Sequence, residues 1–221
     1  MKKWTKLGQV KTPDGSVLAL VEHDGEYLLR VDGRELMSTR RHASELRLGV
    51  VGCLRIQKRP RAKVLIGGLG LGFTLRGALA TLGPDAEVIV AELMPEVVAW
   101  NREESYPLAH KELADERTRV VVGDVFEVIE RDVYDAIMLD ADNGTTAMMT
   151  AGNRALYERR GLERVKDALS PGGVAVYWSA GPEPEFAALM RKVGFDVTIE
   201  RIPAWGTGGP LHTLVIGVMR A

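Results

Sequence analysis

Four acidic residues and one glycine-rich loop carry the chemistry that this sequence suggests. The loop, residues 67–72, follows an apolar run and precedes a helical segment. Its glycines have the spacing G-x-G-x-G, at Gly68, Gly70 and Gly72, which allows a tight turn and a close approach of backbone to ligand. The dinucleotide fingerprint needs a glycine where this chain has Phe73, so the loop favours a nucleoside without a pyrophosphate.

Two of the acids follow the loop, each at the end of a predicted strand. Glu92 lies where a carboxylate can accept from both ribose hydroxyls. Asp124 lies where it can accept from an adenine amine, with Val125 beside it as apolar cover. The alternative for each acid is helix capping. Because ligands bind at the carboxyl ends of strands in open α/β sheets, loop and acids together favour a nucleoside site that also includes Gly67.

The fourth predicted strand ends in a further acidic run, Asp140-Ala141-Asp142-Asn143-Gly144. Asp140 is expected at the same rim as the glycine loop, where a carboxylate can deprotonate an amine or hold its cationic form. A second carboxylate nearby raises one pKa and makes a better base, so Asp142 is the second candidate catalytic residue. The alternative is a loop cap made by Asp142 and Asn143.

A sheet must bring these strand ends to one edge. From residue 62 onward, apolar runs alternate with segments of helical periodicity, which predicts a parallel sheet covered on both faces. Only a Gly/Pro loop joins the last two runs, which favours an antiparallel pair. The predicted strands are 63–66, 87–91, 119–122, 136–139, 174–178, 196–201 and 213–218, and the helices lie near 73–82, 95–105, 125–130, 155–169 and 184–193.

The N-terminal part of the chain has a different pattern. Short apolar runs are separated here by three Asp-Gly pairs, at positions 14–15, 24–25 and 32–33. Asp-Gly between apolar runs is a strong hairpin signal. We predict a β-meander over residues 1–41 and a second domain over residues 42–221, which opens with a linking helix at 42–57. A meander this small must pack on its own domain or on a partner chain.

Composition excludes several classes of protein. The 221 residues are 46% hydrophobic and 27% charged, which is a globular balance. Lys and Arg number 29 against 30 Asp and Glu, which argues against a nucleic-acid partner. A single cysteine, Cys53, excludes a disulfide framework and suggests the cytoplasm. No apolar run is long enough for a membrane span, and no cluster has the spacing of metal ligands.

Serine and histidine side chains could also take part in catalysis. Ser44 and Ser170 have no histidine partner in a recognisable nucleophile motif, so a hydrolase triad is unsupported. His212 has two interpretations, a proton shuttle or a hydrogen-bonded structural residue at a strand start.

Together the motifs resemble the spermidine synthase family, within the wider class of S-adenosylmethionine-dependent transferases. The resemblance rests on residues 64–76, 92–97, 123–124 and 134–144 and extends over nearly the whole chain. It implies a Rossmann-like, seven-stranded sheet of methyltransferase type behind a small N-terminal antiparallel β-domain, in a homodimer. It also implies that Glu92 holds the ribose, Asp124 contacts the adenine, and Asp140 serves an attacking amine.

The departures from that family fall on residues that handle the polyamine. Leu71 stands where the family usually carries an Asp that pairs with the free amine of decarboxylated S-adenosylmethionine. The family's Tyr-His-Glu, which lines the polyamine tunnel, is Ala43-Ser44-Glu45. A leucine in place of the acid removes the preference for an ammonium over a carboxylate, so the ordinary methyl donor becomes more plausible.

These features lead to an α/β transferase that uses S-adenosylmethionine or its decarboxylated form and a small-molecule acceptor, without a metal. Methyl transfer to an amine-type nucleophile is slightly preferred. The first alternative is an aminopropyltransferase that makes spermidine or a related polyamine. The second is a non-catalytic nucleoside-binding homologue.

Overall fold

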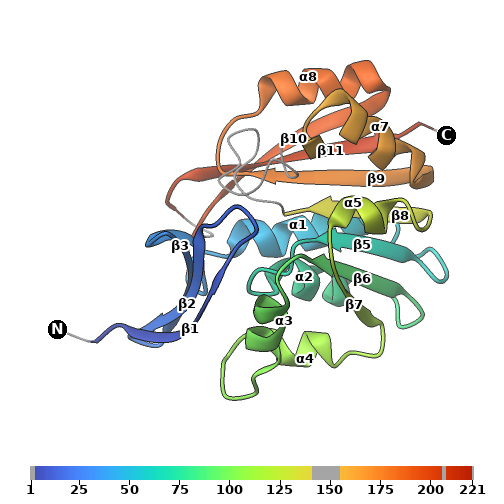
Figure 1. The fold of residues 1–221 in the computed structure, drawn as a ribbon. Helices are drawn as coiled ribbons and strands as arrows, with labels where there is room; N and C mark the ends of the chain where they lie inside the picture. The colour runs from blue at the N-terminus through green and yellow to red at the C-terminus, as the bar shows by residue number, and fades with distance from the viewer. Residues whose placement is uncertain (1–2, 141–154, 206–207, 221) are drawn as a thin grey trace.

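The computed structural model describes residues 3–140, 155–205 and 208–220. These residues form two sheets (Figure 1), one four-stranded with the order β1-β2-β3-β4 and one seven-stranded with the order β10-β11-β9-β8-β5-β6-β7. The large sheet has helices on both faces, and the small sheet is antiparallel throughout. The predicted fold class, a Rossmann-like sheet of methyltransferase type with a small N-terminal β-domain, is therefore confirmed.

The small sheet is a continuous meander of β1 (Thr5–Lys11), β2 (Val17–His23), β3 (Glu26–Val31) and β4 (Arg34–Ser38). Its turns follow the Asp-Gly pairs. Asp24 and Gly25 have φ of 54° and 74°, and Asp32 and Gly33 have 48° and 79°. Positive φ at both central residues is what a type I′ hairpin requires, so these two pairs form the hairpins that their chemistry predicts.

The large sheet has a parallel centre and an antiparallel end. Its strands are β5 (Lys63–Gly67), β6 (Glu87–Glu92), β7 (Thr118–Val122), β8 (Tyr134–Leu139), β9 (Leu169–Ser179), β10 (Phe195–Pro203) and β11 (Leu211–Met219). Strands β5 to β9 pair in parallel, whereas β11 lies antiparallel between β9 and β10. The predicted antiparallel pair is confirmed. The five parallel strands, β5 to β9, therefore end at one edge of the sheet.

Strand alternation divides the core into two layers. In β5, Val64 and Ile66 belong to one buried cluster and Leu65 to the other. The first cluster includes α1 (Ala43–Leu54), α2 (Phe73–Thr81) and α3 (Pro95–Arg102), and the second includes α5 (Val125–Ile129), α7 (Arg159–Asp167) and α8 (Pro184–Val193). A short helix that the sequence did not suggest, α4 (His110–Leu113), lies beside β7. Within the described ranges, no helix combines the length and apolar character that a bilayer span needs.

The small sheet packs on its own chain. Leu18 and Leu20 of β2 and Leu29 and Val31 of β3 are all buried in the same cluster as the apolar faces of α1 and α2. The sequence left two possibilities, packing within the chain or on a partner chain. The structure shows packing within the chain, on α1 and α2.

Helices α1 and α2 cross at two glycines. A Cβ added at Gly49 of α1 would lie 2.1 Å from the carbonyl oxygen of Thr74, and one added at Gly77 of α2 would lie 2.2 Å from that of Leu46. The two backbones are thus in direct contact, which no residue larger than glycine permits. This close crossing sets the first turn of α1 against the first turn of α2.

We expect Gly77→Ala to destabilise the protein by about 1–3 kcal/mol, because the added methyl group overpacks a backbone contact, although alanine is the better helix former. Urea unfolding measures the loss. Gly181→Ala is the matched control, since nothing lies within 4 Å of its added Cβ. Equal stability of the two variants would contradict the close crossing.

Candidate active site

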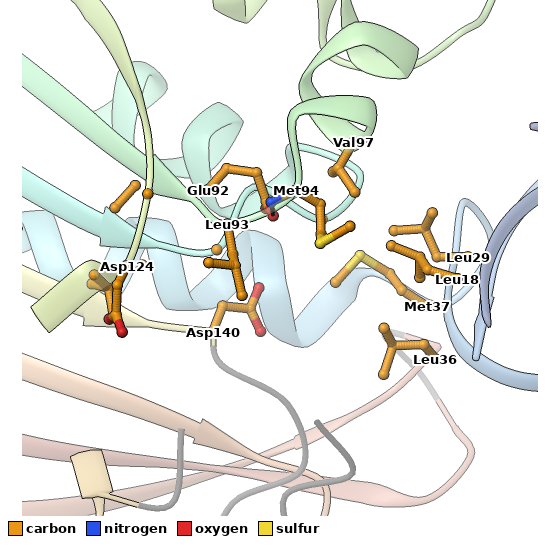
Figure 2. Close-up of a pocket in the computed structure, with 16 residues that line it drawn as sticks. Leu18, Leu29, Leu36, Met37, Glu92, Leu93, Met94, Val97, Asp124 and Asp140 are labelled. Carbon is orange, nitrogen blue, oxygen red and sulfur yellow. Dashed lines mark hydrogen bonds between the residues drawn. The ribbon is translucent and has the colours of Figure 1, made fainter. Parts of the chain in front are cut away.

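A pocket of about 890 Å³, its open mouth included, lies at the carboxyl ends of β5 to β8. Figure 2 shows its two sides. Glu92, Asp124 and Asp140 lie on the strand-end side, and the N-terminal sheet contributes the opposite, apolar side. Of the nine candidate site residues, seven line the pocket: Gly67, Gly68, Gly70, Glu92, Asp124, Val125 and Asp140.

The two other candidates are placed differently. Gly72 does not line the pocket; it precedes α2 with φ of 81°, and a Cβ there would lie 2.2 Å from the Cβ of Ala109. The glycine at this position therefore serves close packing. Asp142 lies outside the described residues.

Glu92 ties the glycine loop to the end of β6. Its Oε2 accepts from the N–H of Leu69 and its Oε1 accepts from the N–H of Met94, both at 2.8 Å. The side chain is buried, and this burial raises the pKa of Glu92 although the backbone N–H groups oppose the shift. A carboxylate has further lone pairs, so Glu92 can hold the loop and still accept from ligand hydroxyls.

Asp124 begins helix α5 at the same rim. Its Oδ1 accepts from the N–H of Phe126 at 2.8 Å, which is an N-cap contact. Asp124 is exposed, and both Asp124 and Val125 line the pocket. From the sequence, helix capping was the alternative to ligand binding for Asp124. The structure allows the same side chain to do both.

Asp140 follows β8 and reaches the glycine loop. Its N–H donates to the carbonyl oxygen of Gly67 at 3.0 Å, and its Oδ2 accepts from the hydroxyl of Thr74 at 3.0 Å. Burial raises the pKa of Asp140 to about 6, while the Thr74 hydroxyl acts in the opposite direction. A carboxyl with a pKa near neutrality is suited to exchange protons with an amine.

A second acid, Glu45, lies behind Asp140. It is in the first turn of α1, only 4% exposed, and its backbone carbonyl lies 3.2 Å from the same Thr74 hydroxyl, whose single proton the two acceptors share. Burial, then repulsion from Asp140, raises the pKa of Glu45 to about 7 against the effect of the Ser44 hydroxyl. Sequence reasoning did not select Glu45 as a site residue, although its place in the Ala43-Ser44-Glu45 motif was a usable signal.

Ser44 has a histidine partner after all. Its fully buried Oγ lies 2.7 Å from Nδ1 of His212, 2.5 Å from Oε2 of Glu45 and 3.0 Å from the donating Nε1 of Trp178. No nucleophile motif indicated this contact, because β11 brings in a residue 168 positions away. The enclosed hydroxyl has no access to a substrate, so a hydrolase remains unsupported.

Leu71 does not form the pocket wall. Its side chain is 1% exposed in the core cluster shared with α1 and α2, and only its backbone N–H turns toward the N-terminal sheet, 3.2 Å from the sulfur of Met37. The replacement of an acid by Leu71 therefore removes a charge without adding an apolar contact for a donor. Within the described part of the chain, no group of three or more His, Cys, Asp or Glu side chains is placed to hold a metal.

We predict that the pair of carboxyls makes stability fall as the pH rises. Both have folded-state pKa values above their ordinary ones, about 6 for Asp140 and about 7 for Glu45. Their contribution is complete below the ordinary pKa values of 3.8 and 4.5, and it is lost as the pH rises from there through the raised values. Glu45→Gln should therefore gain about 1–3 kcal/mol over the parent between pH ~5 and ~8.

Chemical unfolding at each pH measures this difference. Glu104→Gln, at an exposed position, is the control and should parallel the parent. A constant offset for Glu45→Gln across the range would show that Glu45 does not titrate with the raised pKa.

Comparisons with known proteins are informative only at the level of structure. No protein-family model and no curated protein matches the chain. A spermidine synthase in complex with the transition-state analogue AdoDATO superimposes with a TM-score of 0.75 at 18% identity, and spermidine synthase from Thermotoga maritima with 0.75 at 19%. Each match covers 97% of this chain and 72% of the other. The chain therefore has the fold of the spermidine synthases over almost its entire length.

Proposed function

We propose that this protein transfers an aminopropyl group from decarboxylated S-adenosylmethionine to an amine. The observation that carries the proposal is the Asp140 carboxyl in a pocket with a nucleoside-type rim, with the buried carboxyl of Glu45 near enough to be repelled by it. Two acids that influence each other electrostatically attract an ammonium group and can accept its proton. The slight preference for methyl transfer drawn from the sequence gives way to its alternative.

The charge of the pocket supports the decarboxylated donor. Three carboxylates line it, and none of its described lining residues is Lys, Arg or His. The carboxylate of S-adenosylmethionine finds no cationic partner there, whereas the decarboxylated donor carries only positive charge. The neighbours are spermidine synthases, one of them bound to a transition-state analogue, which also favours aminopropyl over methyl transfer.

Each part of the pocket has a role in this mechanism. Glu92 accepts from the ribose hydroxyls, Asp124 and Val125 receive the adenine, and the glycine loop lets the donor approach the backbone. Asp140 orients the acceptor amine and takes its proton. The free amine nitrogen then attacks the propyl carbon in line with the C–S bond, whose electron pair passes to sulfur and leaves a neutral thioether.

Donor binding tests the class of group that is transferred. We expect decarboxylated S-adenosylmethionine and methylthioadenosine to bind about tenfold or more tighter than S-adenosylmethionine and S-adenosylhomocysteine, because the pocket repels the carboxylate of the second pair. Titration calorimetry with the four compounds measures the order. The reverse order would favour methyl transfer, and no binding at all would end the nucleoside hypothesis.

Asp140→Asn tests whether the site is catalytic. The amide keeps the shape of the carboxyl but cannot accept the amine proton, so we expect kcat to fall by about 10²–10⁴-fold with nearly unchanged donor affinity. Turnover with putrescine and calorimetry measure the two quantities. Full activity of Asp140→Asn would remove Asp140 from the mechanism, and an inactive parent with intact donor affinity would support a non-catalytic homologue.

A further inference from the structure

One buried hydroxyl group lies between the candidate active site and the helices behind it. Thr74 is in the first turn of α2, is 2% exposed and does not line the pocket. Its Oγ1 is 3.0 Å from Oδ2 of Asp140, which follows β8, and 3.2 Å from the backbone carbonyl oxygen of Glu45 on α1. Thr74 therefore reaches the pocket through Asp140 and not by a contact of its own.

The hydroxyl of Thr74 points away from its own helix. A threonine within a helix can bond back to a carbonyl of that helix, as Thr81 at the other end of α2 does, to Gly77 at 2.8 Å. The two contacts of Thr74 instead lead to α1 and to the residue after β8. The close crossing of α1 and α2 brings both acceptors to one side chain, so Thr74 joins three separate elements.

This hydroxyl can hold Asp140 in each of its protonation states, because it has one proton and two lone pairs. When Asp140 is ionised, or carries its proton on Oδ1, the Thr74 hydroxyl donates to Oδ2. When the proton is on Oδ2, the acid donates to Oγ1 and the Thr74 proton turns to the Glu45 carbonyl. That carbonyl also belongs to the hydrogen-bonded backbone of α1, so it is satisfied in every case.

We propose that Thr74 is a positioning residue, which keeps one oxygen of Asp140 fixed while the carboxyl takes the proton of the acceptor amine. The inference rests on the proposed function, in which Asp140 orients that amine and accepts its proton. The backbone of Asp140 is also held, since its N–H donates to Gly67 at 3.0 Å and a Cβ at Gly68 would lie 2.9 Å from its carbonyl oxygen. With the backbone and Oδ2 both held, the carboxyl keeps one orientation toward the pocket.

The charged groups around Asp140 leave this task to Thr74. On α1, the carboxyl of Glu45 is close enough to be repelled by Asp140, while Glu92 and Asp124 line the same pocket. An ionised carboxyl donates no hydrogen bond, and the described residues of the lining include no Lys, Arg or His. The Thr74 hydroxyl therefore stabilises the ionised form of Asp140, and it lowers a pKa that burial raises to about 6.

Titration of the Asp140 carboxyl tests the contact without any need for activity. Thr74→Val removes the hydroxyl at nearly constant shape, so the pKa of Asp140 should rise. Thr74→Ala, which adds no bulk, should raise it as well, whereas Thr74→Ser should stay near the parent. Carboxyl ¹³C NMR follows each titration, with the Asp140 signal identified by its loss in Asp140→Asn.

Thr81→Val on the same helix is the matched control, because the hydroxyl removed there bonds to α2 itself. It should leave the pKa of Asp140 unchanged. An unchanged pKa of Asp140 in both Thr74→Val and Thr74→Ala would overturn the proposal.

Kinetics with putrescine as the acceptor test whether catalysis uses the contact. In Thr74→Val, kcat should fall on the order of tenfold to a hundredfold, with nearly unchanged donor affinity because Thr74 does not line the pocket. The acidic limb of kcat/KM should also move to higher pH, since Asp140 must be ionised to accept the proton and its pKa is raised. Thr74→Ser should restore most of both effects, because it keeps the hydroxyl.

An acidic limb at the parent's position in Thr74→Val and Thr74→Ala, or an equal loss of kcat in Thr81→Val, would overturn the positioning role. A parent that turns over no amine would instead defeat the proposed function, and the carboxyl titration would then decide on the Thr74 contact alone.

Discussion

The close crossing of α1 and α2 at Gly49 and Gly77 is the constraint on which the site depends. It lets two backbones touch, and this contact brings the Thr74 hydroxyl within reach of both the Glu45 carbonyl and the Asp140 carboxyl. A larger residue at either glycine would separate the helices and move Glu45 on α1 away from Thr74 on α2. The packed helices help to bury both carboxyls, and burial raises the pKa of each.

Much of the fold and of the rim was predictable, because local patterns carry that information. The Asp-Gly turns, the alternating strands and the antiparallel end of the sheet each depend on a few neighbouring residues. Glu92, Asp124 and Asp140 were found because each lies at or just after the end of a strand, and parallel strands end at a shared edge. The contact between Ser44 and His212 was missed because it joins residues 168 positions apart through the order of β9 and β11. No local pattern contains that order.

The difference between local patterns and long-range contacts also explains why Leu71 and Gly72 were misplaced. Both were interpreted as loop residues that face a ligand, since the motif includes them. In the structure the Leu71 side chain enters the core and Gly72 packs against Ala109. Spacing identifies a loop, but the direction of each side chain depends on the helices and sheet that enclose it. The charge of the whole pocket lining therefore says more about the donor than the side chain at position 71 does.

The pocket has one further consequence, since its lining comes from both sheets. Leu18, Leu29, Leu36 and Met37 belong to the N-terminal sheet, while the acids belong to the large one. A ligand that fills the space between them binds only when both are folded and docked, so its binding free energy is added to the stability of the small sheet. The opening equilibrium of the hairpins, and with it the exchange of their amide protons, thereby becomes a function of ligand concentration. In the cell, the N-terminal sheet would survive proteolysis longest when its ligand is abundant.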